Sequence, residues 1–565
     1  MAHTIDRRTL LVGAAAAGLR SLLPGRASAE DASDEKNARH RHRGPVREFQ
    51  LVSRKVYKDP FWDASVDVLV TGPGGRRFRV PAFWSGGSVW RWRFWDPQPG
   101  TYRYETIASD TTNRDLHGVA GEFRIDEDRG ENPLFRRGPL KVSENRRYLE
   151  AADGTPFLWL GDTWWMGLTE RLAWPDEFQR LAADRREKGF NVIQLVAGLY
   201  PDMDSFDPRG KNEAGYPWER GYQRIAPAWW DLAERRIEHL IGMGLVPCIV
   251  GCWGYYLKKI GMKKMQAHWR TIIARWGAWP VVWCLAGEGS MPWYLSERKD
   301  EERAELEAGW TEMARYVRRT DPFHRLITIH PSRSSRDVVR DPTVLDFEML
   351  QTGHSDYRSI PNTLKTIAEA YRREPTMPVV EAEVCYEGIM HSCRQDIQRF
   401  MFWSALLNGC CGFTYGANGI WQVNQPGKPF GPSPHGRTWG NTPWQEAMNH
   451  SGSRQVGIGA RFLRSLPWHQ MQPHPEWVEP HWNKSNYHAP SAAGIPRKLR
   501  VIYTPARWNP PRLTRLEKGL AYRARLVNPS TGDVVPFGTL RADDSGECRL
   551  GHFPEQRDWV IVLEC

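Results

Sequence analysis

Two glutamates that follow short apolar runs are the clearest candidates for chemistry in this 565-residue sequence. VVWCLAGEG (281–289) places Glu288 between two glycines, and PVVEAEV (378–384) carries Glu383 near its end. Two carboxyl groups that flank a glycosidic bond can cleave it, because one donates a proton to the leaving oxygen while the other attacks the anomeric carbon or activates water. The alternative for either residue alone is a buried, paired structural carboxylate. The glycines beside Glu288 are expected to let a ligand approach closely.

The elements that must position these glutamates lie between 140 and 455, where apolar runs alternate with amphipathic stretches. Apolar runs without alternation predict strands covered on both faces, hence a parallel sheet. Eight such units with helices between them predict a (β/α)8 TIM barrel. The fifth helix is poorly signalled, because only 333–340 separates strands five and six. Strands are expected at 157–163, 191–198, 245–252, 281–288, 326–331, 345–353, 378–384 and 411–417, and helices at 175–188, 228–243, 262–276, 301–319, 361–373 and 392–408.

In such a barrel, residues at the carboxyl ends of the strands build the site. Glu288 would end strand four and Glu383 strand seven, so the two side chains can converge on one bond. Glu381 and Glu387 are rivals of Glu383. Alternation along the strand would place residues 381 and 383 on one face with 383 nearer the rim, and Glu387 would lie in the following loop.

Seven further residues near the expected strand ends are candidates for binding a substrate, and each also has a structural interpretation. The aspartate either holds substrate hydroxyls or caps the turn after strand one. The histidines either hydrogen-bond the nucleophile or the substrate, or are satisfied within the core, and the tyrosine can donate to the nucleophile. The tryptophans either stack on a sugar ring or pack in the core. These residues are Asp162, Trp164, Trp253, His330, His354, Tyr415 and Trp421.

Both flanks of the barrel are rich in predicted strands. Short alternating runs punctuated by turn residues predict an N-terminal β-sandwich at 48–130. A second β-rich segment, 456–565, contains a hairpin pattern (YRARLVNPSTGDVV) and predicts a C-terminal β-sandwich. Within the barrel, the polar loops 199–226 and 418–442 are expected to wall the cleft.

The charge distribution and the cysteine spacing argue against nucleic acid as a partner and against a metal site. The net charge is +11, but no dense Lys/Arg stripe appears, which disfavours nucleic acid as a partner and merely permits an anionic glycan. The nine cysteines have no metal-ligand spacing, and most sit in apolar runs, so we expect small buried hydrophobes and neither a metal nor a cofactor.

The first residues are typical of an export signal. Arg7 and Arg8 precede a mildly apolar stretch, and 27–29 offer a small-residue cleavage site, which favours a twin-arginine signal peptide at 1–29 and a periplasmic or secreted protein. An ordinary Sec signal or a disordered tail is the alternative. The apolar stretch is too short to span a bilayer, and no membrane span is expected. Residues 30–47 are polar and are predicted to be a linker.

Several segments together carry a family resemblance. FLWLGDTWWMGL (157–168), WCLAGEG (283–289), PVVEAEVCYEG (378–388) and GFTYGANGIWQ (412–422) resemble the apiosidase-like glycoside hydrolases. VPAFWSGGSVWRWRFWDPQPGTYRYE (80–105) is similar to the β-sandwich that precedes the barrel in that family, and the C-terminal segment is similar to its small β-domain described as collagen-binding.

The resemblance implies that Glu288 is the general acid/base and Glu383 the nucleophile. Many relatives carry Asp in a Gly-Gly-Asp setting where this chain has Ala-Gly-Glu288, so neither substrate nor stereochemistry carries over. The leading hypothesis is an exported glycoside hydrolase that cleaves a complex plant or bacterial polysaccharide by a two-carboxylate, retaining mechanism. A non-catalytic carbohydrate-binding or matrix-adhesion protein is the alternative, and a polysaccharide lyase is a third. The oligomeric state is not predicted.

Overall fold

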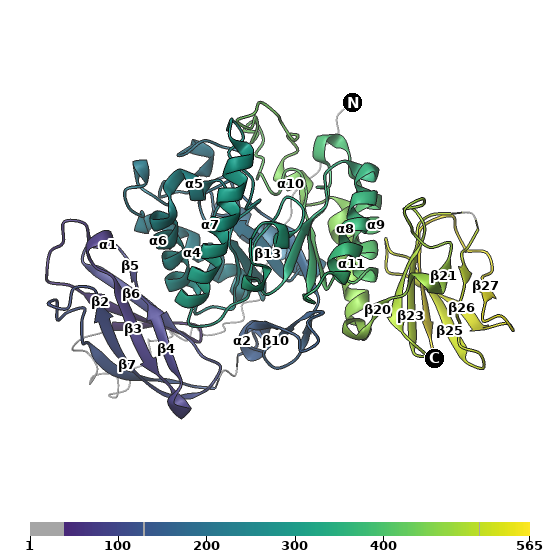
Figure 1. Cartoon of the computed structure of the whole chain (residues 1–565), viewed down its shortest axis with the longest axis horizontal. Coiled ribbons are helices and arrows are strands. Elements are labelled where there is room, and N and C mark those ends of the chain that lie inside the picture. Colours follow the sequence, from purple (N-terminus) through teal and green to yellow (C-terminus); the bar gives the residue numbers. More distant parts are fainter. Residues whose placement is uncertain (1–38, 128–129, 508) are drawn as a thin grey trace, which may run out of the picture.

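The computed structural model describes residues 39–127, 130–507 and 509–565. An N-terminal β domain, a central barrel and a C-terminal β domain lie in a row (Figure 1). The expected signal peptide at 1–29 lies outside the described residues. Among the described residues, no helix combines the length and the apolar character needed to cross a membrane.

The N-terminal domain is a sandwich of two four-stranded antiparallel sheets. Alternating burial along the strands turns one face of each sheet inward, where the rings of Phe49 and Trp92 stack with 4.1 Å between their centroids. Residues 39–43, which the sequence placed in the linker, form strand β1 and pair with β2. The sheets have the orders β1-β2-β6-β5 and β4-β3-β7-β8, with β1 Arg39–Arg43, β2 Val46–Val52, β3 Val66–Thr71, β4 Arg77–Pro81, β5 Phe83–Trp84, β6 Val89–Phe94, β7 Gly100–Ala108 and β8 Ala120–Ile125.

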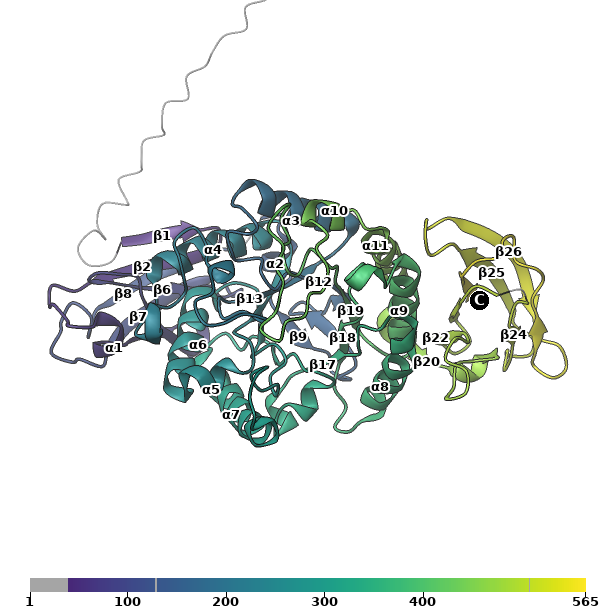
Figure 2. The same cartoon turned by 90° about the horizontal axis from the view of Figure 1, so that it is seen from above.

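The central domain contains the expected eight parallel strands. Each expected apolar run contains one strand, in every case shorter than the run. The first strand pairs with the eighth, so the sheet curls into a barrel that helices surround (Figure 2). The strands are β12 Trp159–Thr163, β13 Val192–Val196, β14 Val246–Val250, β15 Val282–Cys284, β16 Ile327–Thr328, β17 Glu348–Gln351, β18 Val379–Glu383 and β19 Gly412–Tyr415.

The barrel has one seam, because β16 and β17 are neighbours without a ladder between them. One backbone hydrogen bond, of 2.8 Å from the Asp346 amide to the Ile327 carbonyl, and side-chain hydrogen bonds bridge the seam instead. Asp346 Oδ2 accepts a hydrogen bond of 2.6 Å from the Ile327 amide, and the Thr328 hydroxyl donates to the Phe347 carbonyl over 2.9 Å. The loop after β16 also pairs with β17 through a bridge between Ser334 and Leu350.

The six expected helices are present around the barrel. Helix α3 shows the local signals that set their ends, with acidic residues in its first turn and Gly189 at its C-cap with φ of +92°. Only the short 3-10 turns at Ser335–Asp337 and Pro342–Val344 occupy the place of the fifth helix. Helix α11 was not expected from the sequence, and it packs against α9 and α3. The helices are α3 Asp176–Lys188, α4 Pro227–Gly242, α5 Tyr256–Ile260, α6 Met262–Trp276, α7 Lys299–Thr320, α8 Ile360–Arg372, α9 Gln395–Leu407, α10 Trp444–Ala447 and α11 Ser451–Arg464.

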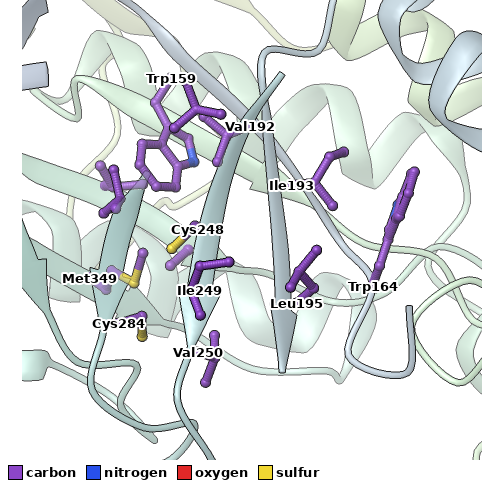
Figure 3. Packing of buried hydrophobic residues seen from close by; sticks show 14 of the residues in the cluster. Trp159, Trp164, Val192, Ile193, Leu195, Cys248, Ile249, Val250, Cys284 and Met349 are labelled. Atoms are coloured by element: carbon purple, nitrogen blue, oxygen red, sulfur yellow. The ribbon is translucent and has the colours of Figure 1, made fainter. Parts of the chain in front are cut away.

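The barrel interior and the layer under its helices form one apolar core. Figure 3 shows Ile193, Leu195, Ile249 and Val250 packed along adjacent strands, with Cys248 among them. Seven of the nine cysteines are buried and unpaired, as the apolar runs around them predicted.

The C-terminal domain contains two antiparallel sheets that enclose a small core of their own. Helix α9 of the barrel contacts strands β22 and β23, and Arg399 on that helix pairs with Asp558 at 2.8 Å. The larger sheet has the order β20-β22-β23-β28-β25-β26, with β20 Gln472–Pro473, β22 Ser491–Ile495, β23 Leu499–Thr504, β25 Ala521–Val527, β26 Val534–Arg541 and β28 Trp559–Glu564; the smaller has β21 Val478–Glu479, β24 Arg512–Leu513 and β27 Cys548–Arg549.

Candidate active site

A cavity of about 240 Å³ lies at the carboxyl ends of the barrel strands and contains both glutamates. A larger hollow of about 810 Å³ borders the N-terminal sandwich, and its lining includes neither glutamate. The walls of the smaller cavity come from the carboxyl ends of seven of the strands and the loops that follow them, β16 being the exception. Its lining residues are Trp165, Pro201, Asp202, Trp253, Glu288, Met291, Tyr294, Gln351, His354, Glu383, Tyr386, Ile389, Trp421, His435 and Trp439.

Gln351, the last residue of β17, links the two carboxyl groups. Its Nε2 donates to Glu288 Oε1 over 3.2 Å and to Glu383 Oε1 over 3.0 Å. Since one nitrogen reaches both, these two oxygens are no more than about 6 Å apart. This upper limit admits the ~5–5.5 Å between carboxyl groups of retaining glycosidases and lies just below the ~6.5–9.5 Å of inverting ones.

Glu383 is surrounded by donors that stabilise its charged form. Tyr386 Oη donates to Glu383 Oε2 over 2.6 Å, and His354 Nε2 lies 2.9 Å from Oε1. His330 is fully buried, with Nε2 3.4 Å from Oε2. Burial alone would raise the pKa of Glu383, but His330 and His354 outweigh it and lower the pKa to about 2.

Glu288 has the opposite electrostatic environment. Burial disfavours its charged form, the negative charge of Glu383 adds to this, and together they raise the pKa of Glu288 to about 7 against the lowering effect of Gln351. At neutral pH Glu383 is therefore ionised, while a substantial fraction of Glu288 carries a proton. Two nearby carboxyl groups with separated pKa values are suited to act as nucleophile and acid.

The glycines around Glu288 have a different role from the one expected. A Cβ on Gly287 would lie 2.2 Å from the Trp253 ring, and one on Gly289 would lie 2.5 Å from the Ile329 side chain. The missing side chains make room for protein packing rather than for a ligand. Glu288 itself adopts φ of +42°, an uncommon conformation for a residue other than glycine.

Aromatic rings make up much of the remaining wall. Tyr386 stacks on His354 with 4.9 Å between ring centroids, and on Trp421 with 5.8 Å. Trp165 Nε1 donates to Tyr386 Oη over 3.0 Å. The indole N–H groups of Trp253 and Trp421 have no hydrogen-bond partner among the described residues, although both side chains are buried. Buried donors of this kind usually bond to water or a ligand.

Of the seven residues proposed from the sequence for substrate binding, four lie at the cavity or against Glu383 and three do not. Trp253, His354 and Trp421 line the cavity, and His330 contacts Glu383 from the buried side. The other three do not line it. These are Asp162, Trp164 and Tyr415.

Asp162 and Tyr415 belong to a buried polar network beside the cavity. Asp162 Oδ2 pairs with Arg185 Nε at 2.5 Å and accepts from Trp164 Nε1 over 2.7 Å, and all three side chains are fully buried. Tyr415 Oη donates to Glu387 Oε2 over 2.6 Å and not to Glu383. Of the two interpretations of Asp162, this geometry favours the structural one.

Strand β18 contains a β-bulge between Glu381 and Glu383. Leu350 pairs with Glu381 and the next residue, Gln351, pairs with Glu383, so Ala382 is an extra residue in β18. The alternation from which a common face was expected is therefore interrupted. Glu383 lines the cavity and Glu381 does not, and burial raises the pKa of Glu381 well above its ordinary value.

Several cavity residues were not proposed from the sequence. Trp165 and Tyr386 carried weak signals, since Trp165 follows a proposed residue and Tyr386 comes three residues after Glu383. Gln351 is the last residue of β17, and four others lie in long loops whose folding the pattern of the sequence does not determine. They are Asp202, Tyr294, His435 and Trp439.

Two family models match parts of this sequence. The family model described as the apiosidase-like catalytic domain matches residues 143–470, and a domain of unknown function (DUF5060) matches residues 45–109. The comparison with curated proteins gave no match.

Solved structures show the same fold. One glycoside hydrolase is 22% identical with a TM-score of 0.60, over 76% of this chain and 97% of its own. A glycoside hydrolase family 5 protein from Bacteroides vulgatus is 20% identical with a TM-score of 0.60, over 76% and 94%. A provisionally assigned glycoside hydrolase from the same species is 17% identical with a TM-score of 0.67, over 92% and 98%. Since the family model covers more than half of the sequence, the chain belongs to the apiosidase-like family of glycoside hydrolases.

Proposed function

We propose that this chain is an exported, retaining glycosidase that acts on a complex plant or bacterial polysaccharide, with Glu288 as general acid/base and Glu383 as nucleophile. The assignment rests on two carboxyl groups that accept hydrogen bonds from the same amide, that of Gln351, and whose pKa values are shifted in opposite directions. The pKa is about 7 for Glu288 and about 2 for Glu383. Export is proposed from the twin-arginine pattern ahead of the described residues.

In the first step, the ionised Glu383 attacks the anomeric carbon as protonated Glu288 donates to the leaving oxygen. The glycosidic bond breaks and a covalent glycosyl-enzyme ester forms. In the second step Glu288, now ionised, takes a proton from water, which attacks the same carbon and releases Glu383. The proposed stereochemistry rests on the short span between the carboxyl oxygens, which leaves little room for a water molecule between Glu383 and the sugar.

The remaining residues would support these steps. Tyr386 and His354 would hold the Glu383 carboxylate in one orientation, and Gln351 would fix its distance from Glu288. Trp253 and Trp421 would pack against the sugar and donate their free indole N–H groups to its hydroxyls. A hydroxyl-rich ligand suits these unpartnered donors.

The test is a screen of the purified chain and its Glu383→Ala variant against plant and bacterial polysaccharides. We expect the parent to release sugar and the variant to release none while keeping the thermal transition of the parent. NMR of the first product should show the anomeric configuration of the substrate. An inverted product would refute the nucleophile role of Glu383, and binding without release by both proteins would favour adhesion.

A further inference from the structure

A third carboxyl group, that of Asp202, lies in the cavity without a role in two-carboxylate chemistry. It belongs to the loop after β13, is only 7% exposed and adopts φ of +54°. This left-handed conformation is uncommon outside glycine, although Asp tolerates it better than most residues. The backbone thus holds an acidic side chain at a fixed place in the cavity wall.

Residues from two other loops hold Asp202 in position. Trp439 Nε1, from the loop after β19, donates to Asp202 Oδ2 over 3.2 Å. Tyr294 Oη, from the loop after β15, accepts from the Asp202 amide over 3.2 Å. His435 Nε2 lies 3.8 Å from Asp202 Oδ1, beyond direct hydrogen-bond range. A ligand hydroxyl could therefore bond to Oδ1 beside the imidazole.

No arginine or lysine is among the residues that line this cavity. Elsewhere the chain pairs buried carboxylates with guanidinium groups, as Asp162 with Arg185 and Glu348 with Arg336. The Arg209 guanidinium donates a hydrogen bond to Asp202, but to its backbone carbonyl and not to its carboxylate. Its ion pair is with Asp207, at 2.7 Å. Among the described residues, the Asp202 carboxylate thus has no arginine or lysine partner, and a ligand hydroxyl can bond to it.

The small size of the cavity brings any bound ring close to all three carboxyl groups. Its volume of about 240 Å³ is below the ~300 Å³ at the lower end of ordinary ligand pockets. A sugar hydroxyl can donate to a carboxylate, whereas a sugar carboxylate would be buried beside like charges with no arginine or lysine from the wall, and the His354 imidazole is already paired with Glu383.

Resting on the proposed function, we propose that Asp202 is a specificity-determining residue: it accepts hydrogen bonds from the hydroxyls of an uncharged sugar ring in the cavity and excludes uronic acids. Trp439 and His435 are positioning residues, because they act on the sugar through the orientation of Asp202. The same chemistry applies whether the ring comes from a plant or a bacterial polysaccharide.

The kinetic test compares the parent with Asp202→Asn, and Asp204→Asn serves as the matched control. Asp204 lies two residues away in the same loop, carries the same charge, is exposed and does not line the cavity. On the polysaccharide that the parent degrades, the released sugar should be uncharged. Asp202→Asn should lower kcat/KM at least about tenfold, mainly through KM, since the amide loses charge-assisted hydrogen bonds. Asp204→Asn should stay within about twofold of the parent, since it changes only an exposed charge.

Release of a uronic acid, or equal effects of the two substitutions, would overturn the proposal while leaving the glycosidase assignment intact. Activity retained in Glu383→Ala would instead refute the proposed function. A second readout does not need turnover. Crystals of Glu383→Ala soaked separately in glucose, galactose, glucuronate and galacturonate should show a neutral sugar bonded to Asp202 and no uronate, and a uronate in the cavity, or no sugar at all, would count against the proposal.

Discussion

Tyr386 and Glu383 are joined by a hydrogen bond of 2.6 Å from the phenol to the carboxylate. Tyr386 lies in the loop that begins where β18 ends, so the strand that carries Glu383 also supplies its donor. The residue proposed for this role from the sequence, Tyr415, instead donates to Glu387. The two tyrosines thus form a natural pair for comparison.

Tyr386→Phe should lower kcat/KM by about tenfold to a hundredfold, because a hydrogen bond to a charged group contributes ~1.5–3 kcal/mol. The ring that stacks on His354 and Trp421 is retained. Tyr415→Phe is the control: it should leave kcat/KM near that of the parent and lower the free energy of unfolding by about 1–3 kcal/mol, since Glu387 loses a buried partner. Steady-state kinetics and urea titrations measure both. A larger kinetic effect at Tyr415 would contradict the placement of the site.

The pH dependence of kcat/KM should be bell-shaped. Activity requires Glu383 ionised and Glu288 protonated, so it should fall as the pH drops toward about 2, where Glu383 gains its proton, and fall again above about 7, where Glu288 loses one. Glu288→Gln should remove the alkaline limb on an activated substrate. An alkaline limb that survives this substitution would assign the titration to another group.

Glu288→Ala should affect substrates according to their leaving groups. Aryl glycosides with acidic phenols need little protonation, so their hydrolysis should be reduced far less than that of the natural polysaccharide. Parallel measurements of kcat/KM on both kinds of substrate test this. Equal losses would argue against Glu288 as the acid.

Asp162→Asn should affect stability rather than chemistry. The substitution removes one of two carboxylates that pair with the buried Arg185 and leaves Asp184 as its partner, so the loss should stay below the about 3–5 kcal/mol that leaving a buried charge unpaired costs. Chemical denaturation measures the loss, and active-site titration gives the activity per folded molecule, which should match that of the parent. A selective rise in KM at unchanged stability would restore the substrate-binding interpretation of Asp162.

Gly287→Ala should disturb the cavity through Trp253. The new methyl group would lie 2.2 Å from the present position of the Trp253 ring, so the ring or the strand end must move. We expect a loss of kcat/KM larger than that of Gly551→Ala, the control at an exposed loop position where a Cβ meets no atom within 4 Å and φ lies outside the left-handed region. Tryptophan fluorescence should report the displaced ring.

The barrel and its two glutamates could be predicted because their signals are local. A run such as VVWCLAGEG determines both the burial of a strand and the identity of the residue at its end. The bulge at Ala382 has no comparable signal, because it depends on how β18 pairs with β17. Asp202, His435 and Trp439 could not be placed for a related reason: their loops meet only after the barrel has formed, and the contacts between them span more than 200 residues.

The seam between β16 and β17 also separates the two glutamates. Glu288 follows β15 on one side, and Glu383 ends β18 on the other. The shorter path around the barrel wall from one carboxyl group to the other therefore crosses the junction that has no ladder. The Gln351 amide hydrogen-bonds to both carboxyl groups and so links them directly. Contacts such as those of Asp346 and Thr328 hold β16 beside β17, so we expect a single substitution there to change the distance between the two carboxyl groups while every strand keeps its ladder.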